Sequence, residues 1–324
     1  MATPTAAVGF EPRHRSFSRR FLGGDEIAYA VTWLFATSIL AVTVLLVYEL
    51  WIHSSPALGK FGFGFITSKL WNPVTDQFGA LPFIYGTVIT SLLALLISVP
   101  LGVGAAIYLS ELATSKVSNV LTFLVELLAA VPSVIFGLLA IFTLVPLMRE
   151  YIGPGLQKVF GDFPLFSGPV FGVGYLSAGI ILAVMTFPFI ISVSREALMS
   201  VPREQREAAL ALGATKWEST WQVVVPFARL GILGSVFLAL ARALGETMAV
   251  TMVIGNDPAI HASLLSPGYT IAAIIANEFT EATGNTYLSA LVELGLVLFF
   301  LTMVINGLAQ LLIVITTGKG SAKA

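Results

Sequence analysis

An arginine and a glutamate lie inside one long apolar run of this sequence, where ionisable side chains are costly. Arg242 and Glu246 both fall within residues 223–254, and a charge at the centre of a membrane helix costs ~2.5–3.5 kcal/mol on insertion scales. In a continuous helix this spacing puts both side chains on one face, where they can form an ion pair. The planar guanidinium can also hold two oxygens of an oxyanion at once. The pattern therefore predicts either an anion path across a membrane or an internal ion pair that fixes helix register.

Small residues accompany the two charges on one helical stripe. They let membrane helices pack closely or line a path. We therefore expect Arg242 and Glu246 to point into the protein and not toward lipid. The stripe consists of Gly231, Ser235, Ala239 and Gly245.

Other residues in the apolar runs are weaker candidates for the same path. Glu126 and Glu293 are ionisable, although Glu126 lies near the end of its run and can instead snorkel or bond a neighbouring helix. Pro132 and Ser133 would serve either the path or helix packing. Prolines remove a backbone hydrogen bond and should kink the helices that contain them. The prolines concerned are Pro100, Pro132 and Pro188.

The composition shows which elements must position these side chains. Apolar residues make up 56% of the chain and charged residues 11%, so the chain cannot cover itself with polar surface as a soluble domain does. Runs of about 20 apolar residues cross the hydrocarbon core. We predict an all-α, polytopic integral membrane protein with a permease domain over residues 27–316. Its six spans are 27–52, 81–109, 120–147, 173–193, 223–254 and 287–316.

The distribution of positive charge predicts the orientation of the spans. Lysine and arginine are concentrated in the segments that share a side with the N-terminus, and those segments are retained in the cytoplasm. We therefore assign the tails 1–26 and 317–324 to the cytoplasm. The lysines and arginines assigned to the outer loops are Lys60, Lys69, Arg149 and Lys158.

The composition gives no reason to expect a metal site or a nucleic acid partner. No cysteine is present and the three histidines are scattered, so no metal site is predicted. A net charge of −1 gives no reason to expect a nucleic acid partner.

A polar helix is predicted over residues 200–214, between the fourth and fifth apolar runs. Ser200 suits the N-cap, Pro202 the first turn, and Gly213 the end of the helix. Its alanines leave room for a partner's backbone. On the cytoplasmic side such a helix is either a docking element or an amphipathic connector lying on the inner leaflet, and its mixed charges favour docking.

The sequence of this helix resembles a known coupling element. Glu207, Ala208 and Ala209, with Gly213 following, are similar to the EAA loop of ABC importer permeases. That resemblance implies a coupling helix that fits a groove on a cytoplasmic ATPase. Residues 241–250 are similar to the signature of the PstC family of phosphate importer permeases, which uses the arginine and glutamate at positions 242 and 246 in transport. Residues 100–111 and 126–138 are similar to that family's second and third spans.

The PstC resemblance implies the remaining parts of the system. The fold would be the type I ABC importer permease (MetI-like) fold in a bacterial inner membrane. The partners would be a PstA-like second permease, a dimeric PstB-like ATPase that holds ATP and Mg, and an external PstS-like phosphate-binding protein. The chain itself lacks a Walker A sequence, because residues 318–321 miss its first glycine. We therefore expect a transport subunit with no cofactor of its own, and not an enzyme.

Two alternative functions remain open at this stage. A permease for sulfate or molybdate would share the coupling helix without needing the Arg242–Glu246 stripe. A secondary transporter or channel would use the two charges as a gate or proton relay and would work without an ATPase.

Overall fold

The computed structural model describes residues 25–161 and 163–318, and side chains as far as residue 311. The predicted terminal tails lie largely outside these residues. The chain divides into two compact units, 1–52 and 53–324, and the account below concerns the second. The helices are α2 (Asp25–Phe61), α3 (Gly64–Thr67), η1 (Pro73–Thr75), α4 (Leu81–Ile107), η2 (Tyr108–Leu112), α5 (Ser115–Ala129), α6 (Ser133–Leu139), η3 (Ala140–Leu144), α7 (Val145–Leu147), η4 (Met148–Ile152), α8 (Gly153–Phe160), α9 (Tyr175–Met199), α10 (Arg203–Ala211), α11 (Lys216–Ser219), η5 (Thr220–Val224), α12 (Val225–Gly245), α13 (Met248–Val253), α14 (Ile271–Glu278) and α15 (Asn285–Gly318).

The described residues form helices joined by turns and loops, with two isolated β-bridges and no strand. Six helical stretches are long and apolar enough to cross a membrane, as the sequence predicts. Four of them begin within about four residues of the predicted spans, whereas the third and fifth differ in ways that affect the site. The six are Glu26–Phe61, Leu81–Leu112, Ser133–Phe160, Tyr175–Met199, Lys216–Gly245 and Asn285–Leu311.

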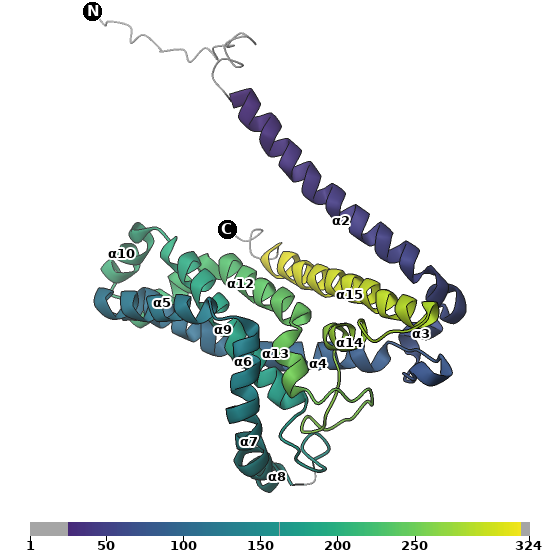
Figure 1. The fold of residues 1–324 in the computed structure, drawn as a ribbon. Helices are drawn as coiled ribbons and strands as arrows, with labels where there is room; N and C mark the ends of the chain where they lie inside the picture. The colour runs from purple at the N-terminus through teal and green to yellow at the C-terminus, as the bar shows by residue number, and fades with distance from the viewer. Residues whose placement is uncertain (1–24, 162, 319–324) are drawn as a thin grey trace, which may run out of the picture. The chain divides into compact units, whose positions relative to one another are not determined.

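The third predicted span, 120–147, is not one continuous helix. The chain forms α5, leaves helical geometry after Ala130, and begins α6 only at Ser133. Pro132 has an extended backbone and is the N-cap of α6, so it interrupts the helix where we predicted a kink. A proline disfavours helical geometry for the residue before it, which explains the break. In Figure 1, α5 and the α6–α8 stretch run in clearly different directions.

The fifth predicted span, 223–254, is also divided. Helix α12 ends at Gly245, Glu246 has an extended backbone (ψ 128°), and α13 starts at Met248. The helices that follow the two breaks pack against each other, because a side chain at Gly137 of α6 would collide with Met252 and approach Ala249 of α13. Two irregular stretches are thus held together by neighbouring short helices.

Prolines elsewhere in the spans are accommodated without a break. Pro100 and Pro188 lie inside α4 and α9. Pro146, Pro154 and Pro226 each follow a π-helical turn, namely η3, η4 and η5. A π turn contains an extra residue and changes the local hydrogen-bond pattern. It therefore accommodates the carbonyl that receives no hydrogen bond because proline has no backbone N–H.

The core of the second unit is formed by α4, α9 and α12, which pack side by side (Figure 1). Small residues allow this close approach, since a side chain at Gly102, Gly179 or Gly231 would overlap Ile190, Leu93 or Ala197 respectively. The buried cluster between them includes Leu182, Met185 and Ala243. The site residues of α9 and α12 are therefore carried by the most closely packed helices of the described chain.

The loop between α2 and α4, which was predicted to lie outside, packs against the protein through aromatic side chains. Trp71 lies edge-on to Phe78 and Phe83, and its indole nitrogen donates to a Glu278 carboxylate oxygen at 2.9 Å. Phe65 and Phe78 are buried. This loop is therefore tied to α14 and α15 by interactions within the protein.

Candidate functional site

Arg242 lies in the last turn of α12 and faces an aromatic ring of the neighbouring helix α9. Its guanidinium carbon is 4.4 Å from the centre of the Phe189 ring, a distance typical of a cation–π contact. Its Nε atom is buried and has no hydrogen-bond partner. Among the described residues no acceptor bonds the guanidinium and no carboxylate pairs with it. The side chain is turned into the protein, as predicted, with its donors uncommitted.

Glu246 does not pair with Arg242, so this prediction is wrong. The predicted pair requires a helix that is continuous from 242 to 246, and α12 ends at Gly245. The Glu246 carboxylate instead accepts a hydrogen bond from the backbone N–H of Ala249, at 3.4 Å. It therefore contacts the first turn of α13, where negative charge is favourable.

Most of the small-residue stripe of α12 is packed within the protein, whereas Gly245 at its end is exposed with open space beside it. The Ser235 hydroxyl is hydrogen-bonded to that of Ser194 on α9, at 2.8 Å. Ala239 is fully buried. A side chain at Gly231 would overlap Ala197. The stripe fixes α12 against α9, and Arg242 and Phe189 extend from this same interface.

The weaker candidates for the anion path do not interact with Arg242 in the described part of the chain. Glu126 is exposed on α5, and Pro132 and Ser133 lie at the break that precedes α6. Glu293 of α15 is 2% exposed, and one of its carboxylate oxygens has no hydrogen-bond partner. No hydrogen bond or ion pair in the described part of the chain joins any of these four to Arg242.

The predicted polar helix is present as α10, with a later start than predicted. Pro202 is its N-cap, whereas the Ser200 hydroxyl donates to the Ala197 carbonyl and belongs to the end of α9. The predicted Ser200 cap is therefore wrong. Gly213 does end the helix, with a φ of 91° that glycine adopts at little cost. The next helix, α11, begins with a capping box formed by Thr215 and Glu218.

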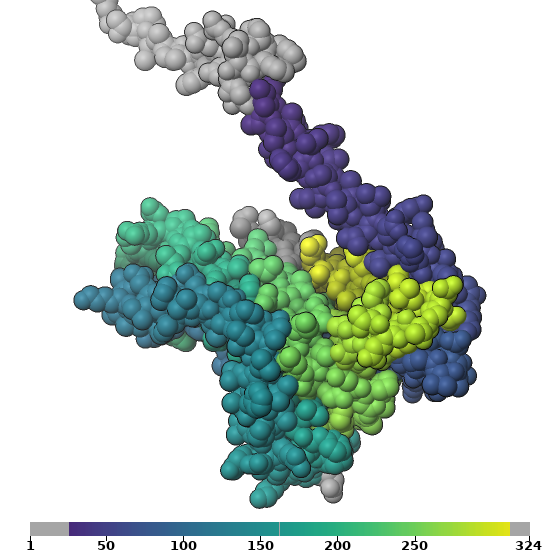
Figure 2. All heavy atoms as spheres, in the orientation of Figure 1, coloured from purple at the N-terminus to yellow at the C-terminus, as the bar shows by residue number. Residues whose placement is uncertain are grey.

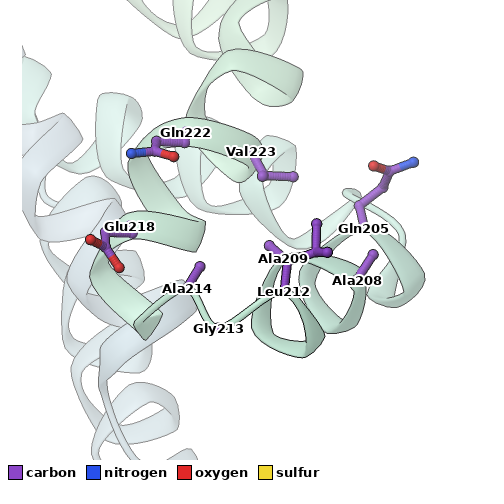
Figure 3. A pocket seen from close by; sticks show the side chains of 9 residues that line it. All are labelled: Gln205, Ala208, Ala209, Leu212, Gly213, Ala214, Glu218, Gln222 and Val223. Atoms are coloured by element: carbon purple, nitrogen blue, oxygen red, sulfur yellow. The ribbon is translucent and has the colours of Figure 1, made fainter.

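Helix α10 presents nearly its whole surface to the outside. It buries no side chain, and Leu212 just beyond it is 90% exposed. A cavity of 600 Å³ lies between α10 and the α11–η5 segment, and side chains from both segments line it (Figure 3). Figure 2 shows this region at one extremity of the second unit. The lining residues are Gln205, Ala208, Ala209, Leu212, Gly213, Ala214, Glu218, Gln222 and Val223.

This geometry gives a helix that is suited to contact with another protein. An exposed leucine and a hollow bordered by alanines and glycine can receive an apolar partner surface, while glutamate and glutamine at the rim can bond to polar groups. Three predicted coupling residues, Ala208, Ala209 and Gly213, line the hollow. Glu207 is exposed on the same helix.

Sequence reasoning missed Phe189. A phenylalanine in an apolar run has no local pattern that distinguishes it, and its contact with Arg242 depends on how α9 packs on α12. A useful clue would have been that a cation inside a membrane protein needs an aromatic or acidic neighbour.

Comparison with known proteins assigns the class to which this fold and site belong. The chain belongs to the family of binding-protein-dependent transport system inner membrane components, whose sequence profile matches residues 98–314. It is therefore a multi-pass inner-membrane permease with an all-α fold.

The curated relatives are permeases named PstC. The phosphate transport system permease protein PstC of Mesorhizobium japonicum is 48% identical, over 90% of this chain and 90% of its own length. The proteins of the same name from Xylella fastidiosa strain 9a5c and Haemophilus influenzae are 48% and 45% identical, over 79% and 89% of this chain and 80% and 93% of their own lengths.

Solved structures agree on the fold. The inward-facing MetNI methionine ABC transporter has a TM-score of 0.53 and 16% identity, over 74% of this chain and 98% of that one. A bacterial alginate ABC transporter in complex with its pentasaccharide-bound periplasmic protein has a TM-score of 0.57 and 17% identity, over 88% and 95%. The predicted MetI-like permease fold is confirmed.

Proposed function

We propose that this chain is the transmembrane permease subunit of an ATP-driven importer of inorganic phosphate. The relatives that it matches over most of its length carry phosphate transport in their names. The observation that carries the proposal within this chain is the Arg242 guanidinium. The guanidinium is turned into the protein and lies against the Phe189 ring. That contact uses none of its hydrogen-bond donors, so they are free to bind an anion.

The electrostatic environment of Arg242 suits transient binding of phosphate. A permanently paired arginine would have to exchange a carboxylate for each passing anion, and the expected Glu246 partner is engaged elsewhere. The Phe189 ring face lowers the cost of holding the cation. Binding of the anion must stay weak enough to allow release, which one arginine without a second fixed cation would provide.

The second part of the proposal concerns the partners. A second, PstA-like permease would complete the path, and a dimeric PstB-like ATPase that binds ATP and Mg would dock on α10 through Glu207 and the hollow ending at Gly213. A PstS-like binding protein would deliver phosphate to the outer loops. Both termini and α10 would then face the cytoplasm. The sulfate, molybdate and ATPase-independent alternatives have no specific observation in their favour.

Uptake of radioactive phosphate by the reconstituted complex tests the path. We expect Arg242→Ala to abolish uptake while the complex still assembles, because the proposed path loses the positive charge that Arg242 supplies. Arg242→Lys should retain part of the uptake, since it keeps the charge and loses the planar fork. Excess sulfate or molybdate should not compete. Normal uptake by Arg242→Ala would contradict the assigned role, and competition by sulfate would contradict the substrate.

Co-purification of the ATPase tests the docking surface. Gly213→Val should lose the bound ATPase, because a β-branched residue strains a backbone with φ 91° and projects into the hollow. Glu207→Lys should weaken binding through charge reversal. The matched control is Lys158→Glu, an exposed charge reversal on α8. Transport by a complex without any ATPase would overturn this part of the proposal.

A further inference from the structure

Arg206 of α10 makes the most extensive set of side-chain hydrogen bonds in the described part of the chain. Its Nε donates to one carboxylate oxygen of Glu111 at 3.1 Å, and its Nη2 donates to the other at 2.9 Å. Nη2 also donates to the Leu198 carbonyl at 2.7 Å, and Nη1 donates to the Val201 carbonyl. A two-pronged arginine–carboxylate pair fixes orientation as well as distance.

The bonded groups belong to two helical segments and to the linker that precedes α10. Glu111 lies in η2, the last turn of the stretch that begins as α4. Leu198 lies in the last turn of α9, and Val201 follows that helix. The last carbonyls of a helix lack their usual partners within it, and the Leu198 carbonyl accepts from the Val201 N–H at 3.3 Å and from Arg206, which also binds Glu111. One side chain of α10 therefore connects to two of the three core helices.

Arg206 is also the main attachment of α10 to those helices. The Arg206 and Glu111 side chains are only 21% and 11% exposed, whereas α10 contributes no buried residue at all. Apolar packing of α10 on α4 and α9 is therefore slight, and its other contacts are with α11 and η5. A largely buried ion pair loses much of its stability when one partner is removed, since the other is left without compensation.

The attachment leads toward the candidate path. Helix α9, whose end Arg206 bonds, carries Phe189, and Phe189 faces Arg242 on α12. Helix α4, whose end carries Glu111, packs along α9. A displacement of α10 that moved Arg206 would therefore pull on the end of α9, which carries Phe189, and on η2 at the end of the α4 stretch, which packs along α9.

We infer that Arg206 and Glu111 are positioning residues that transmit the movement of α10 to α4 and α9, and so couple the ATPase cycle to the opening of the phosphate path. This inference rests on the proposed function. The pair does not contact phosphate or nucleotide. Its removal should therefore uncouple the two activities, and it should leave the ATPase docked on the exposed residues of α10.

The test uses the complete complex in proteoliposomes, with wild-type partner subunits and phosphate-loaded binding protein. Phosphate uptake and ATP hydrolysis are measured on the same preparation. For Arg206→Gln and Glu111→Gln we expect complexes that keep their ATPase and hydrolyse ATP, with phosphate transported per ATP reduced about tenfold. The double variant should be no worse than either single variant, because both remove the same connection. Arg206→Lys should recover part of the ratio.

The matched control is Arg229→Gln, the same substitution at an exposed arginine of α12 outside the docking helix, which should keep the wild-type ratio. An unchanged ratio in Glu111→Gln would overturn the inference, whether the two activities stay normal or fall together. Loss of the ATPase from that complex would overturn it as well, since the pair would then only hold α10 in its docking position. Failure of the wild-type complex to transport phosphate would instead contradict the proposed function.

Discussion

Replacing Phe189 by leucine removes the aromatic ring that faces the Arg242 guanidinium and leaves an apolar side chain in its place. The guanidinium is 4.4 Å from the ring centre and makes no hydrogen bond or ion pair with any of the described residues. Leucine cannot offer a negative ring face, so the cation loses its main stabilising contact in this chain. The cation should then adopt a wider range of positions, and fewer of these can bind phosphate.

The size of the effect follows from the partly buried position of Arg242. Cation–π contacts contribute about 0.5–1 kcal/mol at exposed sites and about 2 kcal/mol when desolvated, so a value near 1 kcal/mol suits a half-buried pair. Since about 1.4 kcal/mol corresponds to a factor of ten, phosphate uptake should fall about fivefold. Arg242→Ala, by contrast, removes the charge and should abolish uptake.

The assay is initial-rate phosphate uptake by proteoliposomes that contain equal amounts of assembled complex. Phe187→Leu is the matched control, because Phe187 is also half-buried on α9 but lines a different, apolar groove between α4, α5 and α9. Phe189→Tyr keeps the ring and should keep uptake near the wild-type rate. The reasoning is refuted if Phe189→Leu transports normally, or if the tyrosine and leucine variants lose uptake equally.

Two further predictions concern the close packing of Gly86 and the hydrogen bond that Glu246 accepts. Gly86→Ala should destabilise the detergent-solubilised protein by about 1–3 kcal/mol in thermal unfolding, because the added Cβ would overlap the Tyr269 carbonyl oxygen. Gly104→Ala on the same helix meets nothing within 4 Å and should not destabilise it. Glu246→Gln should keep at least half of the phosphate uptake, since the amide oxygen can still accept from Ala249; complete loss would show that the negative charge itself is required.

The fold could be predicted from the sequence to the extent that it depends on local composition. Long apolar runs and sharp polar signals such as Gly213 are properties of a few consecutive residues, and the structure confirms the helices that they predict. At Pro132 only a kink was predicted, and the interruption after Gly245 was not predicted at all, because an apolar run looks the same whether its backbone is one helix or two. The predicted pairing of Glu246 with Arg242 failed for that reason. It required a helix that continues through residue 246, whereas α12 ends at Gly245.

The connections between helices could not be predicted in the same way. Arg206 and Glu111 are separated by 95 positions, and Phe189 meets Arg242 only through the packing of α9 on α12. No periodicity in a single sequence relates such residues. The assignment of the termini and α10 to the cytoplasm depends on charge counting and stays a prediction.

The near absence of buried side chains in α10 has a consequence for engineering. The identity of a residue that packs into a core is constrained by its neighbours. The residues of α10, apart from Arg206, are constrained mainly by the protein that binds the helix from outside. The segment from Arg203 to Gly213 is therefore an exchangeable module. Grafting the corresponding segment of another importer, with the arginine retained, should allow this permease to bind that importer's ATPase while its membrane helices keep their fold.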